Sequence, residues 1–265
     1  RDRLMPRYFV QLEYKGSNYL GFQKQSNTKR TIQGHLEKAL SQIANESIKT
    51  TCSGRTDSGV HATNQIVHFD TTSRRSIDSW VKGTNRYLPD DISVIQLYKV
   101  KKDHHARFDA VKRTYKYLLK KSNNNTGLEN EQCLLFRENI NFAAMHKAAQ
   151  HLVGEKDFSS FRASGCQSNS AMREIFEVSV KTKGPYIIFS IVGNAFLLNM
   201  VRIIVGTLLE VGRKKITIKQ FKDIIAAKKR SEAGKTVSPN GLYFIGPEYN
   251  NFQYTKNTVL VDELD

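Results

Sequence analysis

The chain has 265 residues, of which 39% are hydrophobic and 10% aromatic, and this composition excludes a disordered chain. Its 41 Lys and Arg outnumber its 25 Asp and Glu, giving a formal net charge of +16. Such an excess favours a polyanionic partner, nucleic acid first, over a merely soluble basic protein. Three scattered cysteines and the lack of an apolar run near Arg1 argue against a disulfide framework, a zinc site and a signal peptide, so we expect a cytoplasmic protein.

Hydrophobic periodicity and turn signals define the elements that we expect in the first half of the chain. They predict, in order, a strand at 8–14, a helix at 31–44, strands at 48–53 and 65–71, a helix at 77–84 and a strand at 92–100. A glycine-flanked polar turn, 54–59, joins the second and third strands.

The second half follows a charged connector, and we place the domain division there, giving domains 1–106 and 107–265. The pattern then predicts a strand at 114–120, a helix at 141–153, strands at 175–181 and 186–192, an apolar helix at 195–211 and a strand at 242–245. Thr217 and Gln220 have the spacing of a capping box that begins a further helix. Hairpin-spaced strands mixed with helices predict an α+β fold with largely antiparallel sheets.

The apolar helix at 195–211 is better suited to a protein core than to a membrane. It has about 17 residues, the lower limit of a membrane span. Asn199 and Arg202 lie in its middle, and a charge there is costly in a bilayer. We therefore expect no membrane association.

Asp57 is the first candidate for chemistry, because the 54–59 turn can hold one carboxylate at a fixed place beside a sheet. The alternative is an ordinary turn in which the aspartate caps its own backbone.

Arg202 is the second candidate, since its helix is otherwise apolar and an unpaired buried charge is strongly destabilising. It must meet a carboxylate, a phosphate or water, or belong to a structural ion pair or surface stripe.

Tyr115 is the third candidate, because its strand carries Lys112 and Arg113 before it and Lys116 after it. Aromatic rings between cations suit a stacked base whose phosphates are neutralised. The alternative is that Tyr115 and Tyr117 only pack in the core.

The amino-acid sequences of several motifs also resemble those of a known family. Residues 54–61, G-R-T-D-S-G-V-H, closely resemble the G-R-T-D-A-G-V-H signature of the tRNA pseudouridine synthase A family, bacterial type. Seven further matches follow in family order between about Tyr8 and Ile245: Tyr14-Lys15-Gly16 with Gly21-Phe22-Gln23, Thr31-Ile32-Gln33 ahead of Leu36-Glu37, 105–108, 113–117, 157–162, 194–202 and 241–243. The chain departs from the family at Phe22, usually Trp, at Ser58, usually Ala, and at Leu198-Asn199, usually a His-His pair.

The resemblance implies two α/β subdomains joined into a central sheet with a cleft between them, the pseudouridine synthase fold. It implies an isomerase that converts uridine to pseudouridine at positions 38, 39 and 40 of tRNA, with Asp57 as nucleophile. Arg202 would pair with Asp57, Tyr115 would stack on the target base, and Arg55 would fill the gap left by the flipped nucleotide. Family members are homodimers that need no cofactor and no metal.

Further residues are expected to bind the substrate: Gln23, His61, Arg107, Lys112 and Arg113, with Lys15, Lys24 and the 228–235 loop as weaker candidates for tRNA contacts. Two other functions remain open. The first is a noncatalytic RNA-binding protein on the same scaffold. The second is a hydrolase that acts on a sugar, which would normally need a second carboxylate beside the first.

Overall fold

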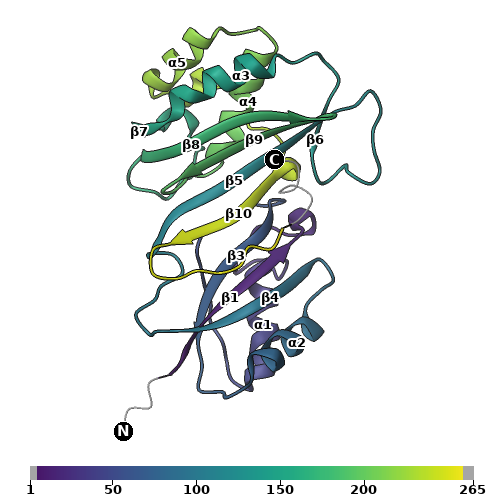
Figure 1. Ribbon diagram of the computed structural model, residues 1–265, viewed down its shortest axis with the longest axis vertical. Coiled ribbons are helices and arrows are strands. Elements are labelled where there is room, and N and C mark those ends of the chain that lie inside the picture. Colours follow the sequence, from purple (N-terminus) through teal and green to yellow (C-terminus); the bar gives the residue numbers. More distant parts are fainter. Residues whose placement is uncertain (1–4, 259–265) are drawn as a thin grey trace. The chain divides into compact units, whose positions relative to one another are not determined.

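The structure is a computed structural model in which residues 5–258 are described. The chain forms two compact units (Figure 1), the first built from residues 5–111 and 244–257 and the second mainly from residues 112–243. The domain division at 106/107 stays a prediction. The compact units differ from it in two respects, because the first unit extends to Val111 and the chain returns to that unit at Phe244.

The first unit combines a mainly antiparallel sheet with two helices. Its strands lie in the order β4-β1-β3-β10, and the short strand β2 pairs with β3. Its elements are β1 (Arg7–Tyr14), α1 (Ile32–Ala44), β2 (Thr51–Cys52), β3 (His61–Asp70), α2 (Ile77–Tyr87), β4 (Ile92–Val100) and β10 (Leu242–Tyr249). Strand β1 is antiparallel to both β3 and β4.

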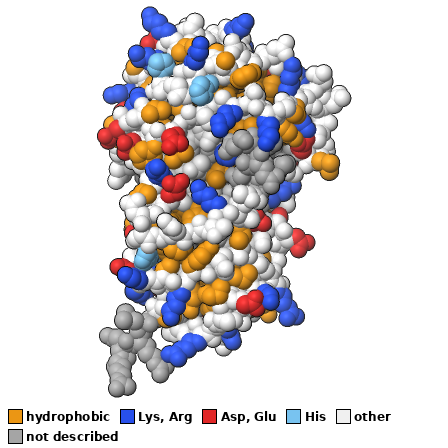
Figure 2. Space-filling view, viewed as in Figure 1, with side chains coloured by type: hydrophobic (Ala, Val, Ile, Leu, Met, Phe, Trp, Pro, Cys, Tyr) orange, Lys and Arg blue, Asp and Glu red, His pale blue; other side chains and the backbone are white. Residues whose placement is uncertain are grey.

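Both faces of this sheet carry buried aromatic side chains. On one face, Tyr8 and Phe69 pack against Trp80 of α2, with ring centroids 6.0 and 5.4 Å from the indole. On the other face, Phe9 meets Phe252 at 4.9 Å. The segment that follows β10 crosses the strands on this second face (Figure 1), and Figure 2 shows apolar side chains gathered there. Adjacent residues of a strand point to opposite faces, so Tyr8 and Phe9 serve two separate cores.

The second unit also combines a sheet with helices. Its strands lie in the order β5-β9-β8-β7, with β6 parallel to β5. Its elements are β5 (Ala110–Lys121), β6 (Leu134–Phe136), α3 (Phe142–Ala149), β7 (Gly154–Asp157), β8 (Met172–Lys183), β9 (Tyr186–Gly193), α4 (Met200–Gly212) and α5 (Ile218–Ala227). Strand β9 is antiparallel to β5 and β8. Ile203, Ile204 and Leu208 of α4 are fully buried, as the apolar pattern requires.

The α+β class with largely antiparallel strands is confirmed. The predicted strands at 8–14 and 92–100 and the predicted helix at 31–44 agree with β1, β4 and α1 within a residue. Thr217 and Gln220 form both bonds of the capping box at the start of α5. The short strands β6 and β7 have no alternating pattern and were not predicted. No helix among residues 5–258 is long and apolar enough to cross a membrane.

Several predicted elements, among them the strands at 65–71 and 242–245 and the helix at 141–153, differ in extent from the structure, and two differences have a clear cause. The helix expected at 195–211 begins only at Met200, because Asn199 takes a left-handed backbone conformation and Leu197 accepts a turn bond from the Met200 amide. The strand expected at 48–53 is reduced to Thr51–Cys52. Its first residues bond to side chains of α1 instead of to a neighbouring strand, as Ile48 does to Ser41 and Thr50 to Glu37.

An ion pair joins the neighbouring strands β1 and β3 where Arg7 lies opposite Asp70. The Arg7 guanidinium donates to both carboxylate oxygens of Asp70, at 2.8 and 3.0 Å, and a third bond runs from Lys102 at 3.0 Å. These donors, Arg7 foremost, lower the pKa of Asp70 to about 2. Because the pKa of Asp70 is lower in the folded than in the unfolded protein, its ionised carboxylate stabilises the folded state. This stabilisation is fully present above the unfolded pKa of about 3.9 and is lost as the pH falls towards 2.

We therefore predict that Asp70→Asn lowers the free energy of unfolding by about 1 kcal/mol at pH 7, since it removes a charge-assisted bond. Urea unfolding of both proteins at several pH values measures the difference. It should shrink between pH 4 and pH 2, and a difference that is constant over this range would contradict the assignment.

Candidate active site

The loop that carries Asp57 is held in place by backbone hydrogen bonds to the segment 19–22. The Phe22 amide donates to the Thr56 carbonyl at 3.0 Å, and the Gly59 amide donates to the Tyr19 carbonyl at 3.3 Å. The Ser58 hydroxyl adds a bond to the same Tyr19 carbonyl at 3.1 Å. Within the loop, the Val60 amide donates to the Asp57 carbonyl at 3.1 Å. The backbone on both sides of Asp57 is therefore fixed.

Two glycines make this close approach possible. Gly21 has φ +88°, and a Cβ there would lie 3.0 Å from the Thr56 carbonyl oxygen. A Cβ on Gly16 would lie 1.9 Å from the Val60 carbonyl oxygen, which no side chain allows. The motifs at 14–16 and 21–23 therefore have a physical reason: they supply the backbone against which the Asp57 loop packs.

Buried polar side chains support the loop from below. The Tyr14 hydroxyl bonds to the Thr56 hydroxyl at 2.7 Å, and the Gln65 amide donates to the Gly54 carbonyl at 2.7 Å. His61 is 2% exposed, and its Nδ1 accepts from the Gly16 amide at 3.0 Å. These contacts give His61 a role in holding the loop, while its predicted contact with substrate stays a prediction.

Asp57 itself is half-buried. Its neighbours Arg55 and Ser58 are exposed, whereas Thr56 and Gly59 are buried. Gln23, which follows the segment that binds the loop, is exposed as well. The loop thus buries Thr56 and Gly59 and leaves Arg55 and Ser58 exposed on either side of Asp57.

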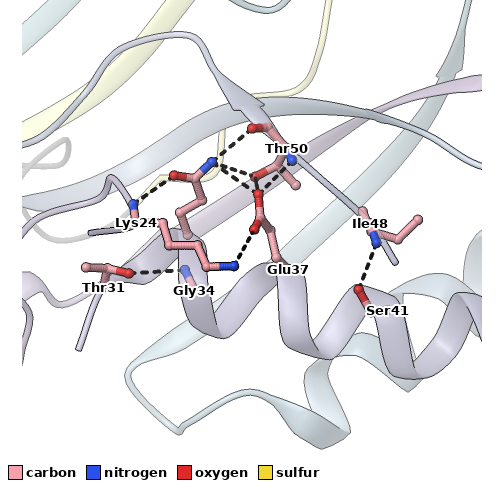
Figure 3. Close-up of polar contacts among 8 residues, drawn as sticks. Lys24, Thr31, Gly34, Glu37, Ser41, Ile48 and Thr50 are labelled. Carbon is pink, nitrogen blue, oxygen red and sulfur yellow. Dashed lines mark hydrogen bonds and ion pairs between the residues drawn. The ribbon is translucent and has the colours of Figure 1, made fainter. Parts of the chain in front are cut away.

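A buried carboxylate connects helix α1 to the strand that leads into this loop (Figure 3). Glu37 is 8% exposed. Its Oε1 accepts from the Thr50 amide at 2.8 Å, the Thr50 hydroxyl at 3.1 Å and the Gln33 side chain at 3.2 Å. Lys24 donates to its other oxygen at 3.4 Å. Gln33 also accepts from the Lys24 amide at 2.9 Å. The motif at 31–37 therefore fixes the start of the 48–54 segment.

We predict that Glu37→Ala destabilises the protein by about 2–3 kcal/mol, because it leaves the buried amide and hydroxyl of Thr50 without their acceptor. Thermal and urea unfolding measure the loss. Asp78→Ala is the control, since its ion pair with Lys82 is highly exposed and should be worth less than about 0.5 kcal/mol. Equal losses in the two variants would contradict the proposed role of Glu37.

Arg202 lies in the first turn of α4 and is half-buried, whereas Val201, Ile203 and Ile204 beside it are buried. Its Nε donates to the Val237 carbonyl at 2.8 Å, and one terminal nitrogen donates to Oδ1 of Asn199 at 2.8 Å. These two neutral acceptors orient the guanidinium. The sequence indicated that Arg202 needs a partner and that Asn199, one turn earlier, is a polar neighbour on the same face, but it gave no sign of Val237.

Tyr115 lies in β5, opposite Ile191 of β9. It is 7% exposed, and its ring meets Phe196 edge-on at 5.0 Å. Tyr117, two residues on, is fully buried and donates its hydroxyl to the Ser238 carbonyl at 2.6 Å. Lys116 between them is also buried, at 6%. Core packing and a predicted role in stacking are compatible for Tyr115, because one edge of a ring can pack while its face serves a ligand.

The other predicted contacts vary in exposure. Arg107 is exposed and lies 5.7 Å from the ring of Phe108, which is 76% exposed. Lys112 and Arg113 are half-buried. The Arg113 guanidinium donates to the Asn194 carbonyl at 2.6 Å, and Lys112 lies over the ring of Phe176. Figure 2 shows Lys and Arg side chains spread over the visible face of both units.

The 228–235 loop is more structured than a free basic loop. Arg230 donates to carbonyls of its own loop, those of Ala233 and Gly234. The Gly234 amide donates to the hydroxyl of Thr207 at 2.9 Å, and a Cβ on Gly206 would lie 1.9 Å from the Lys235 carbonyl oxygen. Backbone of this segment therefore packs directly on α4 and leads to Val237, which holds Arg202.

Comparison with known proteins identifies the family. The sequence model described as tRNA pseudouridine synthase matches residues 11–109 and 148–250. The chain belongs to the tRNA pseudouridine synthase family. It is 42% identical over 255 residues to the tRNA pseudouridine synthase A of Francisella philomiragia, covering 96% of this chain and 98% of that protein. The proteins of the same name from two subspecies of Francisella tularensis, holarctica and novicida, match at the same identity and coverage.

The comparison with solved structures is weaker. A chain of a crystal structure of a Cbf5-Nop10-Gar1 complex matches with a TM-score of 0.33 and 11% identity, over 89% of this chain and 57% of that chain. The family assignment therefore rests on sequence. Asp57, in the first unit, and Arg202, in the second, lie within the two matched segments, whereas Tyr115 lies between those segments.

Proposed function

We propose that this protein isomerises uridine to pseudouridine in tRNA, with the carboxylate of Asp57 as the group that begins the reaction. The observation that supports this most is the Asp57 loop, in which backbone bonds to 19–22 fix a half-buried acid between exposed neighbours. Relatives named tRNA pseudouridine synthase A align with 96% of this chain, and this similarity supports the same activity.

The reaction needs one anion and no added atoms. The N1–C1′ glycosidic bond of uridine breaks, the uracil ring turns, and a C5–C1′ bond forms. The proton leaves C5, and N1 takes up a proton, so that product and substrate are isomers. Asp57 either attacks the sugar or base, or withdraws a proton from the ribose; both routes require an ionised carboxylate.

In this proposal Arg202 and Tyr115 complete the site. A guanidinium beside Asp57 would keep the carboxylate ionised and fix its rotamer. Arg202 suits this role because Asn199 and Val237 already orient its side chain. Tyr115 would stack on the target uracil and assist loss of the C5 proton. The target must leave a stacked stem first, and the exposed Arg55 would occupy the gap.

The remaining contacts serve tRNA binding. Arg107, Lys112, Arg113 and Gln23 would contact the nucleic acid, with a smaller contribution from His61, which is buried. We propose uridines 38, 39 and 40 of the anticodon arm as targets, a homodimer as the active form, the cytoplasm as the location, and a reaction without cofactor or metal. The net charge of +16 supports a polyanionic substrate.

One experiment separates this function from its alternatives. The protein is incubated with tRNA that carries tritium at C5 of uridine. Pseudouridine formation predicts tritium release without free uracil. A hydrolase would release uracil, and a noncatalytic RNA-binding protein would release neither; either result would refute the proposal.

We predict that Asp57→Asn folds and binds tRNA with wild-type affinity but loses turnover by at least about 1,000-fold, because an amide is no nucleophile or base. Single-turnover tritium release and filter binding measure the two quantities. A variant with the wild-type rate would exclude Asp57 as the reacting group.

For Arg202→Leu we expect a folded protein whose turnover falls by about 100-fold or more, since the carboxylate loses its counter-charge. Rates at saturating tRNA, compared with melting temperatures, measure the effect. Wild-type turnover would show that Arg202 only supports the structure of α4.

A further inference from the structure

Helix α4 begins in an unusual way. Four helices, α1, α2, α3 and α5, begin with a residue whose side chain accepts a bond from a backbone amide of the first turn: Thr31, Ser76, Asn141 and Thr217. Asn199 stands at the same position of α4, and asparagine is among the best residues there. Its side chain nevertheless makes no capping bond.

The backbone of Asn199 is also unusual. It lies in the left-handed region, with φ 58° and ψ 10°. Three other described residues that are not glycine have positive φ: Asn45, Lys214 and Lys228. All three stand at or just after the C-terminal end of a helix, where this conformation commonly ends a helix. At the start of a helix it has no such use, so Asn199 bears a conformational cost without a cap in return.

What Asn199 gains is a bond to Arg202. Its Oδ1 accepts from a terminal nitrogen of the guanidinium at 2.8 Å, while Nε of the same side chain donates to Val237 at 2.8 Å. The Val237 amide returns a bond to the Arg202 carbonyl at 3.4 Å. The guanidinium is thus fixed from two directions. Backbone strain that persists beside a charged group commonly marks a functional constraint.

We propose that Asn199 is a positioning residue, which acts through Arg202 by fixing the orientation of its guanidinium. The inference rests on the proposed function, in which Arg202 serves the reaction. It also accounts for one departure of this sequence, because Asn199 occupies a place where the family usually has histidine. An amide oxygen accepts a hydrogen bond at any pH, so the anchor does not depend on a proton.

Asn199→Gly separates this role from a merely structural one. Glycine adopts the left-handed conformation without strain and is accepted at the start of helices, so the fold should keep or gain stability. The amide is lost. We expect unchanged affinity for tRNA, an unchanged or higher melting temperature, and a single-turnover rate about tenfold lower, since a bond to a charged group is removed.

Two further variants complete the test. Asn199→Gly made in the Arg202→Leu background should cause no further loss of rate, because the effect of Asn199 passes through the guanidinium. Thr217→Ala is the matched control: it removes the capping bond that begins α5 and should lower the melting temperature while the rate stays at the wild-type value.

The outcomes distinguish this inference from the function on which it rests. A wild-type rate for Asn199→Gly together with an inactive Arg202→Leu would overturn the positioning role alone. A wild-type rate for Arg202→Leu would overturn both. A tenfold loss caused by Asn199→Gly in the Arg202→Leu background, or a loss of tRNA affinity equal to the loss of rate, would also overturn the positioning role.

Discussion

The contact between two backbone segments, 19–22 and 56–59, is the constraint on which the site depends. It brings carbonyl and amide groups together at 3.0–3.3 Å, where a Cβ on Gly21 would crowd the Thr56 carbonyl oxygen. Gly16 and Gly21 leave that space, and Tyr14 and Gln65 bond to the loop from within the protein. A carboxylate carried on such a loop loses little entropy on meeting its substrate, which is how a single acid can serve as an efficient catalyst.

Arg202, a candidate residue of the second unit, is also held in place by its neighbours. Arg202 is oriented by a carbonyl from Val237 and an amide from Asn199, so a charge that the apolar helix could not accommodate alone has defined partners. Val237 belongs to a segment whose backbone packs on α4, where the Lys235 carbonyl lies directly against Gly206. In both units, close backbone packing at glycines fixes the residue that the proposed chemistry needs.

Much of the fold follows from local pattern, because strong periodicity and capping signals determine α1, α5, β1 and β4 without help from distant residues. Prediction failed where a tertiary contact replaced a local one. Thr50 bonds to Glu37 rather than to another strand, and Asn199 turns left-handed to meet Arg202, which shortens the helix. The candidate residues could be recognised because they lie in motifs whose sequences resemble those of a known family. The scaffolding roles of His61 and Glu37 were not, since nothing in the sequence distinguishes a buried hydrogen-bond acceptor from a ligand-binding one.

The most direct test of this account changes the geometry of the loop and leaves every reacting group in place. Gly21→Ala adds one methyl group at φ +88°, against the Thr56 carbonyl. Pseudouridines are mapped at nucleotide resolution in unmodified tRNA after incubation with each protein. The account predicts that the wild type forms pseudouridine and that the variant binds tRNA equally well but forms it at least about tenfold more slowly, because the carboxylate is displaced. An equal rate of pseudouridine formation in the two proteins would contradict it.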